Sequence, residues 1–123
     1  MSIKKSPLGL PALHESGYRH TSGEAVYVDD MAPPKGTLHA HVVASPIARG
    51  RILRMDLSAA RKVSQVAAVL TADDIPALND ISPFSHDEEL LSTGEVFSIG
   101  QSIALVLAET LEACRAGAAA IVF

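Results

Sequence analysis

The 123-residue sequence contains few aromatic side chains and no tryptophan. Phenylalanine and tyrosine together make up 4% of the residues, whereas 48% of the residues are hydrophobic. The core must therefore be built from valine, leucine, isoleucine and alanine, which bury less apolar area per residue than large rings do. With 20% charged residues, the composition predicts one globular domain of modest stability, because the chain is too short for two ordinary domains.

Cysteine and long apolar runs are also scarce. The single Cys114 excludes an internal disulfide, and its apolar helical position predicts a buried, inert thiol. The longest apolar runs have about six residues, as in Ile103–Ala108, far below the roughly 20 that a membrane span needs. The opening MSIKKSPLGLPALHESG lacks the apolar segment of a secretory signal. We therefore expect a cytoplasmic chain with no membrane partner.

Positive charge is not concentrated anywhere in the chain, and the formal net charge is −4. Proteins that bind nucleic acid need clustered lysine and arginine, so we expect no nucleic-acid partner. The exceptions are Lys4-Lys5 and three arginines close together, Arg49, Arg51 and Arg54. We interpret the arginines as a solvated face or a contact with a partner protein.

Alternating hydrophobicity predicts several short strands, and helical spacing predicts two helices. We expect strands around 25–28, 38–44, 49–57, 66–70, 96–99 and 103–108, and helices at 59–62 and from 111 to the chain end. Ser58, Thr71 and Thr110 stand where N-caps are needed, with Thr71 opening a compact helical turn. Residues 77–92 form a polar loop. This order predicts an α+β fold with a mixed β-sheet and packed helices.

The sequence contains five histidines, each of which is a candidate site residue. His39 and His41 are two positions apart on a predicted strand, where two imidazoles share one face, but a zinc site needs further ligands that the sequence does not supply nearby. We therefore expect both on the exposed strand face, opposite Leu38, Ala40, Val42 and Ala44. We expect His14 and His20 to be exposed near the N-terminus, and His86 to lie in a solvated acidic loop instead of a weak cation site.

Other candidate chemistry is equally incomplete. The adjacent pairs Asp29-Asp30 and Asp73-Asp74 diverge in extended backbone, whereas acid–base catalysis needs carboxyl groups that converge on one substrate. No G-x-S-x-G, P-loop or G-x-G-x-x-G motif is present. Gly100-Gln101 precedes the apolar run 103–108, a position at which an enzyme could place residues that contact a ligand. We interpret it as a tight bend whose amide bonds to the backbone.

An ordered series of short segments resembles one protein family. It begins with His20–Gly23, Ala25–Asp30, Gly36–Ala40 and Ser45-Pro46, and continues with VLTADDIP at 69–76, Asn79-Asp80 and Asp87-Glu88. It closes with Gly94–Val96, Gly100-Gln101 and Val106–Thr110. Over roughly residues 16–122 the series resembles the N-terminal a/b hammerhead domain of the xanthine dehydrogenase and aldehyde oxidase family, with variants most similar to the molybdopterin-binding large subunit of bacterial xanthine dehydrogenase.

The resemblance implies a hammerhead domain over residues 16–123, preceded by an N-terminal arm over residues 1–15. It implies a parent enzyme that hydroxylates a purine or an aldehyde carbon at molybdopterin, with electrons leaving through 2Fe-2S clusters and FAD to NAD. The implied partners are the remaining domains of the large subunit and an iron–sulfur and FAD subunit. The family's cofactor-binding residues and catalytic glutamate lie downstream, so we assign no catalytic, cofactor-binding or metal-binding residue here.

The sequence departs from the family pattern in two places: Ser64-Gln65 replaces Pro-Gly, and Ala77 replaces a common glycine. Both places are turns, so the departures affect local turn geometry. The apolar end AAIVF is typical of a cut inside a longer polypeptide. Two alternatives stay open at this point. One is a stand-alone protein-interaction module with the hammerhead fold, and the other is a small metal-binding protein that uses His39 and His41.

Overall fold

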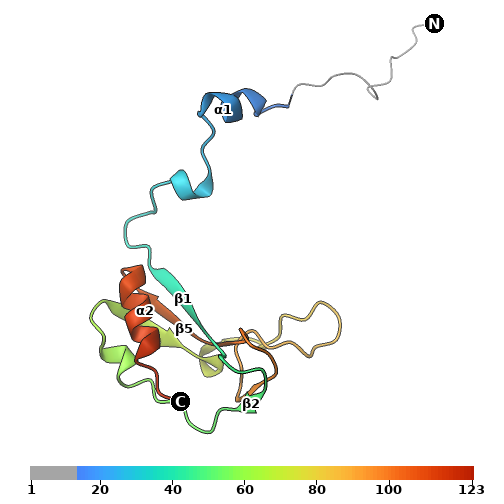
Figure 1. The fold of residues 1–123 in the computed structure, drawn as a ribbon, viewed down its shortest axis with the longest axis vertical. Coiled ribbons are helices and arrows are strands. Elements are labelled where there is room, and N and C mark those ends of the chain that lie inside the picture. The colour runs from blue at the N-terminus through green and yellow to red at the C-terminus, as the bar shows by residue number, and fades with distance from the viewer. Residues whose placement is uncertain (1–13) are drawn as a thin grey trace, which may run out of the picture. The chain divides into compact units, whose positions relative to one another are not determined.

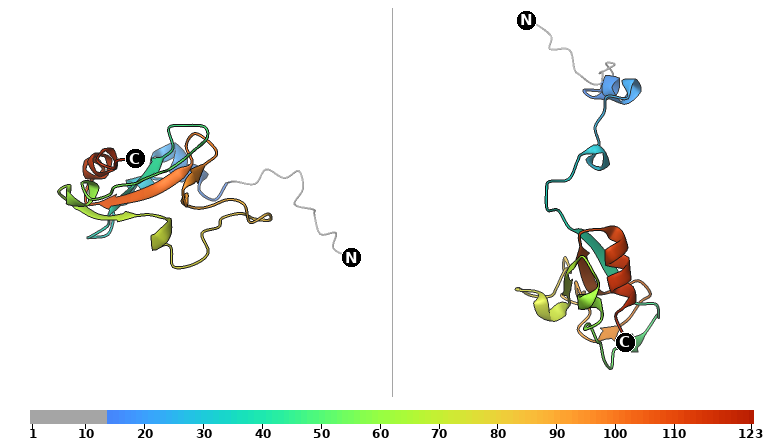
Figure 2. Two further views of the ribbon diagram at one scale, coloured as in Figure 1. Left: turned by 90° about the horizontal axis from the view of Figure 1, so that it is seen from below. Right: turned by 90° about the vertical axis from the view of Figure 1, so that its left-hand side faces the viewer.

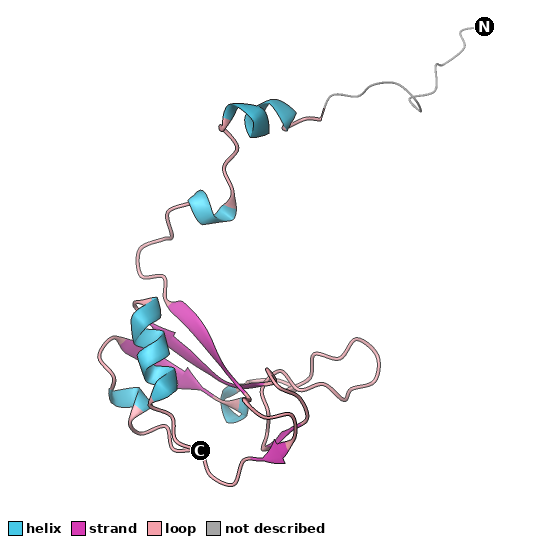
Figure 3. Cartoon of the chain, viewed as in Figure 1, coloured by secondary structure: helices cyan, strands magenta, loops and turns pink. Residues whose placement is uncertain are grey.

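The computed structural model describes residues 14–123, so that nearly all of the arm expected over residues 1–15 lies outside the described residues. The chain divides into two compact units, one ending at Pro34 and the other spanning Lys35–Phe123. Figure 1 labels the main elements, and Figure 3 distinguishes helices, strands and loops. Neither of the α-helices between residues 14 and 123 is long and apolar enough to cross a membrane.

The N-terminal unit contains two short helical elements and no strand between residues 14 and 34. Helix α1 spans Gly17–Ser22 and ends at Gly23, whose φ of 78° lies in the left-handed region. The 3₁₀ helix η1 spans Val28–Asp30. The strand expected around residues 25–28 is therefore wrong: the Tyr27 N–H donates to the Asp30 carboxylate at 2.9 Å, which favours a turn at this point.

The C-terminal unit is built on two antiparallel sheets (Figure 1). The larger has the strand order β1 (His39–Ala44), β5 (Ser102–Ala108) and β3 (Val66–Leu70), and the smaller pairs β2 (Gly50–Arg51) with β4 (Glu95–Val96). The predicted α+β class is confirmed. The strands expected at 49–57 and 96–99 shrink to two residues each, and all strand pairs within residues 14–123 are antiparallel, whereas we expected a mixed sheet.

Helix α2 (Leu111–Ala119) lies on one side of the larger sheet, and η3 (Ala72–Asp74) with the following loop lies on the other side (Figure 2). Under α2, Val43, Val69 and Val106 form a core with Ile121 and with Ala60 of η2 (Ala60–Lys62). Cys114 is fully buried, as predicted. Buried hydrophobic residues in the described chain are all aliphatic apart from this cysteine, which confirms the expectation drawn from composition.

Helix caps follow the sequence signals at two of the three expected positions. The Thr110 hydroxyl accepts from the Ala113 N–H at 3.2 Å and caps α2. Thr71 is the N-cap of η3, where the Asp74 carboxylate accepts from the Thr71 N–H at 2.8 Å. Ser58 is not a cap: the N-cap of η2 is Ala59, and the Ser58 N–H instead donates to the Asp56 carboxylate at 2.9 Å.

The faces of β1 are opposite to the prediction. His41 and Val43 pair with Val106 and Ala104 of β5, on the side that α2 covers, and Val43 is buried. Val42, expected inside, is 48% exposed. The predicted strand is confirmed, but Ala40 and Val42 on its apolar side are both exposed.

Candidate functional site

The turn at Gly100-Gln101 joins the two sheets. Gly100 has a φ of 88°, a left-handed conformation that favours glycine. The Gly100 N–H donates to Ser45 O, and the Ser45 N–H donates to Gln101 O, both at 2.9 Å. These two bonds fix the turn against the end of β1.

The Gln101 side chain is used inside the same turn. Its Oε1 accepts from the Phe97 N–H at 2.7 Å, and its Nε2 donates to Glu95 O at 3.4 Å. The amide thus satisfies backbone groups of residues 95–97, and β5 begins directly afterwards at Ser102. The interpretation of Gly100-Gln101 as a bend with a backbone-bonded amide is confirmed.

The polar loop 77–92 is closed by side-chain bonds at both ends. The Asn79 amide donates to Leu91 O at 2.6 Å and accepts from the Leu91 N–H at 3.0 Å, replacing a pair of strand hydrogen bonds. Further in, the Ser82 hydroxyl accepts from the N–H groups of Asp87 and Glu88. Sequence reasoning missed these bonds. The only signal for them was the Asn79-Asp80 pair that the family resemblance had singled out.

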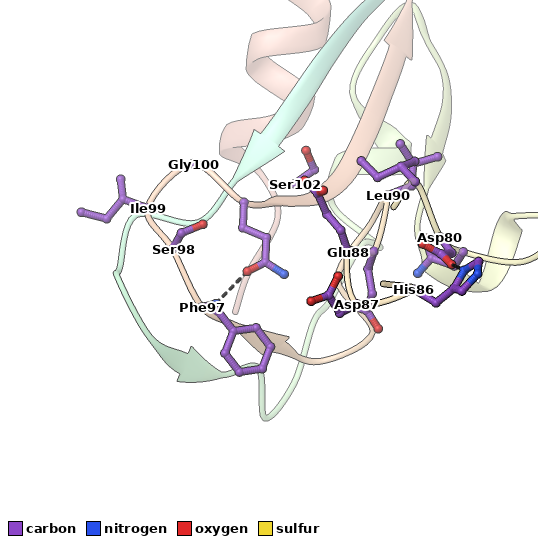
Figure 4. Close-up of a pocket in the computed structure, with 14 residues that line it drawn as sticks. Asp80, His86, Asp87, Glu88, Leu90, Phe97, Ser98, Ile99, Gly100 and Ser102 are labelled. Carbon is purple, nitrogen blue, oxygen red and sulfur yellow. Dashed lines mark hydrogen bonds and ion pairs between the residues drawn. The ribbon is translucent and has the colours of Figure 1, made fainter. Parts of the chain in front are cut away.

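Loop and turn together enclose a cleft with a volume of about 690 Å³ (Figure 4). One wall is the turn from Phe97 to Ser102, and the other is the loop from Asn79 to Leu90. The acidic side chains that line the cleft are Asp80, Asp87, Glu88 and Glu89. His86 also lines it, and Phe97 and Ile99 add apolar surface. The cleft therefore combines negative charge with exposed apolar side chains.

His86 Nδ1 and the Asp80 carboxylate are hydrogen-bonded at the edge of the cleft (Figure 4). The pKa of Asp80 is lowered chiefly by hydrogen bonds from Ser82 and further by His86, so the carboxylate stays charged. Asp80 lies between Ser82 and His86, whereas a nucleophilic triad needs the histidine between serine and carboxylate. The arrangement closes the loop and does not prepare a nucleophile.

The remaining histidines form two groups, one in each unit: the rings of His14 and His20 lie 6.0 Å apart, and His39 and His41 share strand β1. His39 is exposed and His41 half-buried, and both lie on the α2 side of β1, which corrects their expected placement on the exposed face. Among residues 14–123, no group of three or more histidine, cysteine or acidic side chains is arranged to hold a metal ion. His14 and His20 are exposed, as predicted, and His20 Nδ1 lies 2.7 Å from the Tyr27 hydroxyl.

The other charged candidates have local partners. Arg51 pairs with Glu95 at 2.7 Å, Arg54 pairs with Asp56 at 3.1 Å, and the Arg49 guanidinium lies 5.7 Å from the centre of the Phe97 ring. Arg51 and Arg54 are exposed and ion-paired, which agrees with the expected solvated face. In the two aspartate pairs, Asp30 and Asp74 accept backbone N–H groups of their own turns, which gives these carboxylates a structural role.

These observations define a small α+β domain whose polar side chains mainly organise turns. The chain matches the family model for the aldehyde oxidase and xanthine dehydrogenase a/b hammerhead domain over residues 22–123. It is 38% identical to the xanthine dehydrogenase of Oryza sativa subsp. japonica, covering 90% of this chain and 8% of that protein. It is 40% identical to aldehyde oxidase 4 of Mus musculus, covering 87% and 8%.

Solved structures agree with this match. Quinoline 2-oxidoreductase from Pseudomonas putida 86 superposes with a TM-score of 0.82 and 25% identity, over 97% of this chain and 16% of that one. CO dehydrogenase from Oligotropha carboxidovorans gives 0.80 and 29%, over 93% and 14%. The chain belongs to the a/b hammerhead domain family of aldehyde oxidases and xanthine dehydrogenases, and it spans about 8% of the length of the curated relatives it matches.

Proposed function

We propose that this chain is a structural domain in the large subunit of a molybdenum hydroxylase. The observation that carries the proposal is the family match over residues 22–123 by a chain that corresponds to only 8% of each relative's length. The site geometry agrees: the polar residues of the turn and loop satisfy one another, and the described residues bring together no converging acid–base pair or nucleophile.

A phosphate-bearing pterin cofactor does not fit the cleft beside Gly100-Gln101. Four acidic side chains line this cleft, with His86 as the one basic group among the lining residues, and His86 is already paired with Asp80. An anionic phosphate in such a place would meet like charge. The molybdenum cofactor of the proposed enzyme therefore belongs to other domains, and the role of this chain is to support them.

For the parent enzyme we propose oxidation of a purine, xanthine or hypoxanthine to urate, at the molybdenum centre. Electrons would pass to 2Fe-2S clusters, FAD and NAD on partner domains or on a separate subunit. Relatives named xanthine dehydrogenase and aldehyde oxidase are about equally similar to this chain, at 38% and 40% identity. The preference for purine rests on the residue variants TGEV and NDISP in the sequence.

The test is to isolate the polypeptide that carries this sequence from its native cells and to measure its length, its molybdenum content and its oxidation of xanthine and of a simple aldehyde. We expect a chain many times longer than 123 residues that contains molybdenum and oxidises xanthine faster. A molybdenum protein that prefers the aldehyde would contradict the substrate, but not the role of the domain. A native polypeptide of 123 residues without molybdenum would contradict both and favour the stand-alone interaction module.

A further inference from the structure

The larger sheet has a second face, turned away from α2. Strand pairing places Val42 and Ala40 of β1 beside Leu105 and Leu107 of β5, and Leu70 and Ala68 of β3 on the other side of these leucines. We call the surface made by these six side chains the open sheet face. None of the six is buried, although each is apolar.

The two sides of the sheet differ in the polarity of the side chains that face water. On the α2 side, the helix covers the core and presents exposed Glu112 and Arg115 to water. The solvent-facing surface on that side is therefore polar, as expected for a helix packed on a sheet. An antiparallel sheet that ends at water normally carries polar side chains on its outer face, and the open sheet face carries none.

The chain around the open sheet face adds further exposed apolar side chains. Helix η3 and the loop 77–92 lie on this side of the sheet (Figure 2). The loop exposes 78% of Leu78, 52% of Ile81 and 47% of Leu90. Exposed apolar side chains gathered on one side of a domain are typical of an interaction site.

We propose that the open sheet face is the surface through which this domain packs against the rest of its own polypeptide. This inference rests on the proposed function, in which the chain is one domain of a longer subunit. The occupant is an aliphatic layer of that subunit, helix or sheet, without charged side chains at the contact. This chemistry follows from the six side chains, which are all aliphatic and uncharged. A charged group packed against them would be buried without a partner.

The length of the related chains favours the same polypeptide as the occupant. The hammerhead fold of this protein corresponds to 13–16% of the solved chains that it matches, with TM-scores from 0.74 to 0.82. In those proteins most of the polypeptide lies outside this fold and is permanently tethered to it. A tethered layer reaches a high effective concentration at a moderately sized apolar face, whereas a free partner or a second copy does not.

The test uses two cysteine variants of the longer polypeptide, V42C on the open sheet face and A116C on the exposed outer side of α2. Each folded variant is treated with a maleimide, and labelling is followed peptide by peptide by mass spectrometry over a dilution series. We expect V42C to label at least about tenfold more slowly than A116C at every dilution, because labelling would require the interface to open. Both cysteines should label at equal rates in urea.

Equal native rates for V42C and A116C would overturn the inference, since Val42 would then be open to solvent. Protection of V42C that disappears on dilution would also overturn it, because a second copy would then be the occupant. Both results depend on a longer polypeptide being present and are independent of molybdenum content or substrate oxidation. Failure of this inference is therefore distinguishable from failure of the proposed function.

Discussion

At the scale of single residues, Gln101 shows how a side chain that resembles a ligand contact can serve the fold alone. Its amide bonds to Phe97 N–H and Glu95 O, so we expect Gln101→Ala to lower the free energy of unfolding by about 1 kcal/mol. Urea denaturation measures the loss. Gln101→Glu is the matched control because it keeps an oxygen for the shorter bond to Phe97, and it should lose less. Equal stability of Gln101→Ala and the unaltered chain would contradict this role.

Asp74 makes a pH-dependent contribution to the stability of the fold through its hydrogen bonds with Thr71. Hydrogen bonds from the Thr71 N–H and hydroxyl lower the pKa of Asp74. A lowered folded pKa stabilises the fold above the ordinary aspartate value of about 3.9, and this stability is lost as the pH falls through the folded pKa.

We therefore expect Asp74→Asn to lose less stability than the unaltered chain when the pH is lowered from 6 to about 3. Thermal unfolding at a series of pH values measures the difference. Asp73→Asn removes the same charge without either bond to Thr71 and should keep the full acid dependence. If Asp74→Asn and Asp73→Asn behave alike, the hydrogen bonds are not the cause.

At the scale of elements, Gly117 sets how closely α2 approaches the sheet. A Cβ at this position would lie 3.0 Å from side-chain carbons of both Val106 and Val66. Alanine favours a helix by up to about 1 kcal/mol over glycine, but overpacking a tight core costs about 1–3 kcal/mol. We expect Gly117→Ala to destabilise the chain by about 1 kcal/mol, measured by urea denaturation.

The cause of that loss can be isolated in a Val66→Ala background, where one of the two contacts is relieved. We expect Gly117→Ala to cost less there than in the unaltered chain, because the new methyl group occupies the space that valine leaves. If Gly117→Ala costs as much or more in the Val66→Ala background as in the unaltered chain, the packing explanation is contradicted.

Elements whose signals are local and repeated were predictable from sequence, and those decided by distant partners were not. The strand at 66–70, the buried strand before Ala108 and the Thr110 cap follow from apolar runs and a capping residue. The inside of β1 was assigned to the wrong face, because alternation identifies two faces but does not say which one α2 covers. The strand expected around 25–28 failed because Asp30 caps a turn. The Asp80–His86 pair was missed, since loop residues have no periodicity to align them.

At the scale of the whole chain, stability is concentrated in the second unit. Buried hydrophobic residues of the described chain run from Val43 to Ile121, and none lies between residues 14 and 34. The family match nevertheless begins at residue 22, so part of the N-terminal unit belongs to the family pattern without contributing a buried side chain here. The large hydrophobic side chains Tyr18, Val26 and Met31 of the N-terminal unit are exposed. We therefore expect this unit to contribute little to the stability of the chain.

We therefore expect a chain of residues 35–123 to unfold cooperatively within about 2 °C of the melting temperature of the 123-residue chain. For a domain of this size, each kcal/mol of stability shifts the melting temperature by about 4–8 °C. Calorimetry of both chains measures this difference. A chain of residues 35–110, which lacks α2, is the matched control and should not fold, because Cys114, Gly117 and Ile121 cover Val106 and its neighbours. A fall of more than about 5 °C on removing residues 1–34 would correspond to roughly 1 kcal/mol. The buried core between Val43 and Ile121 would then be insufficient to account for the stability of the chain.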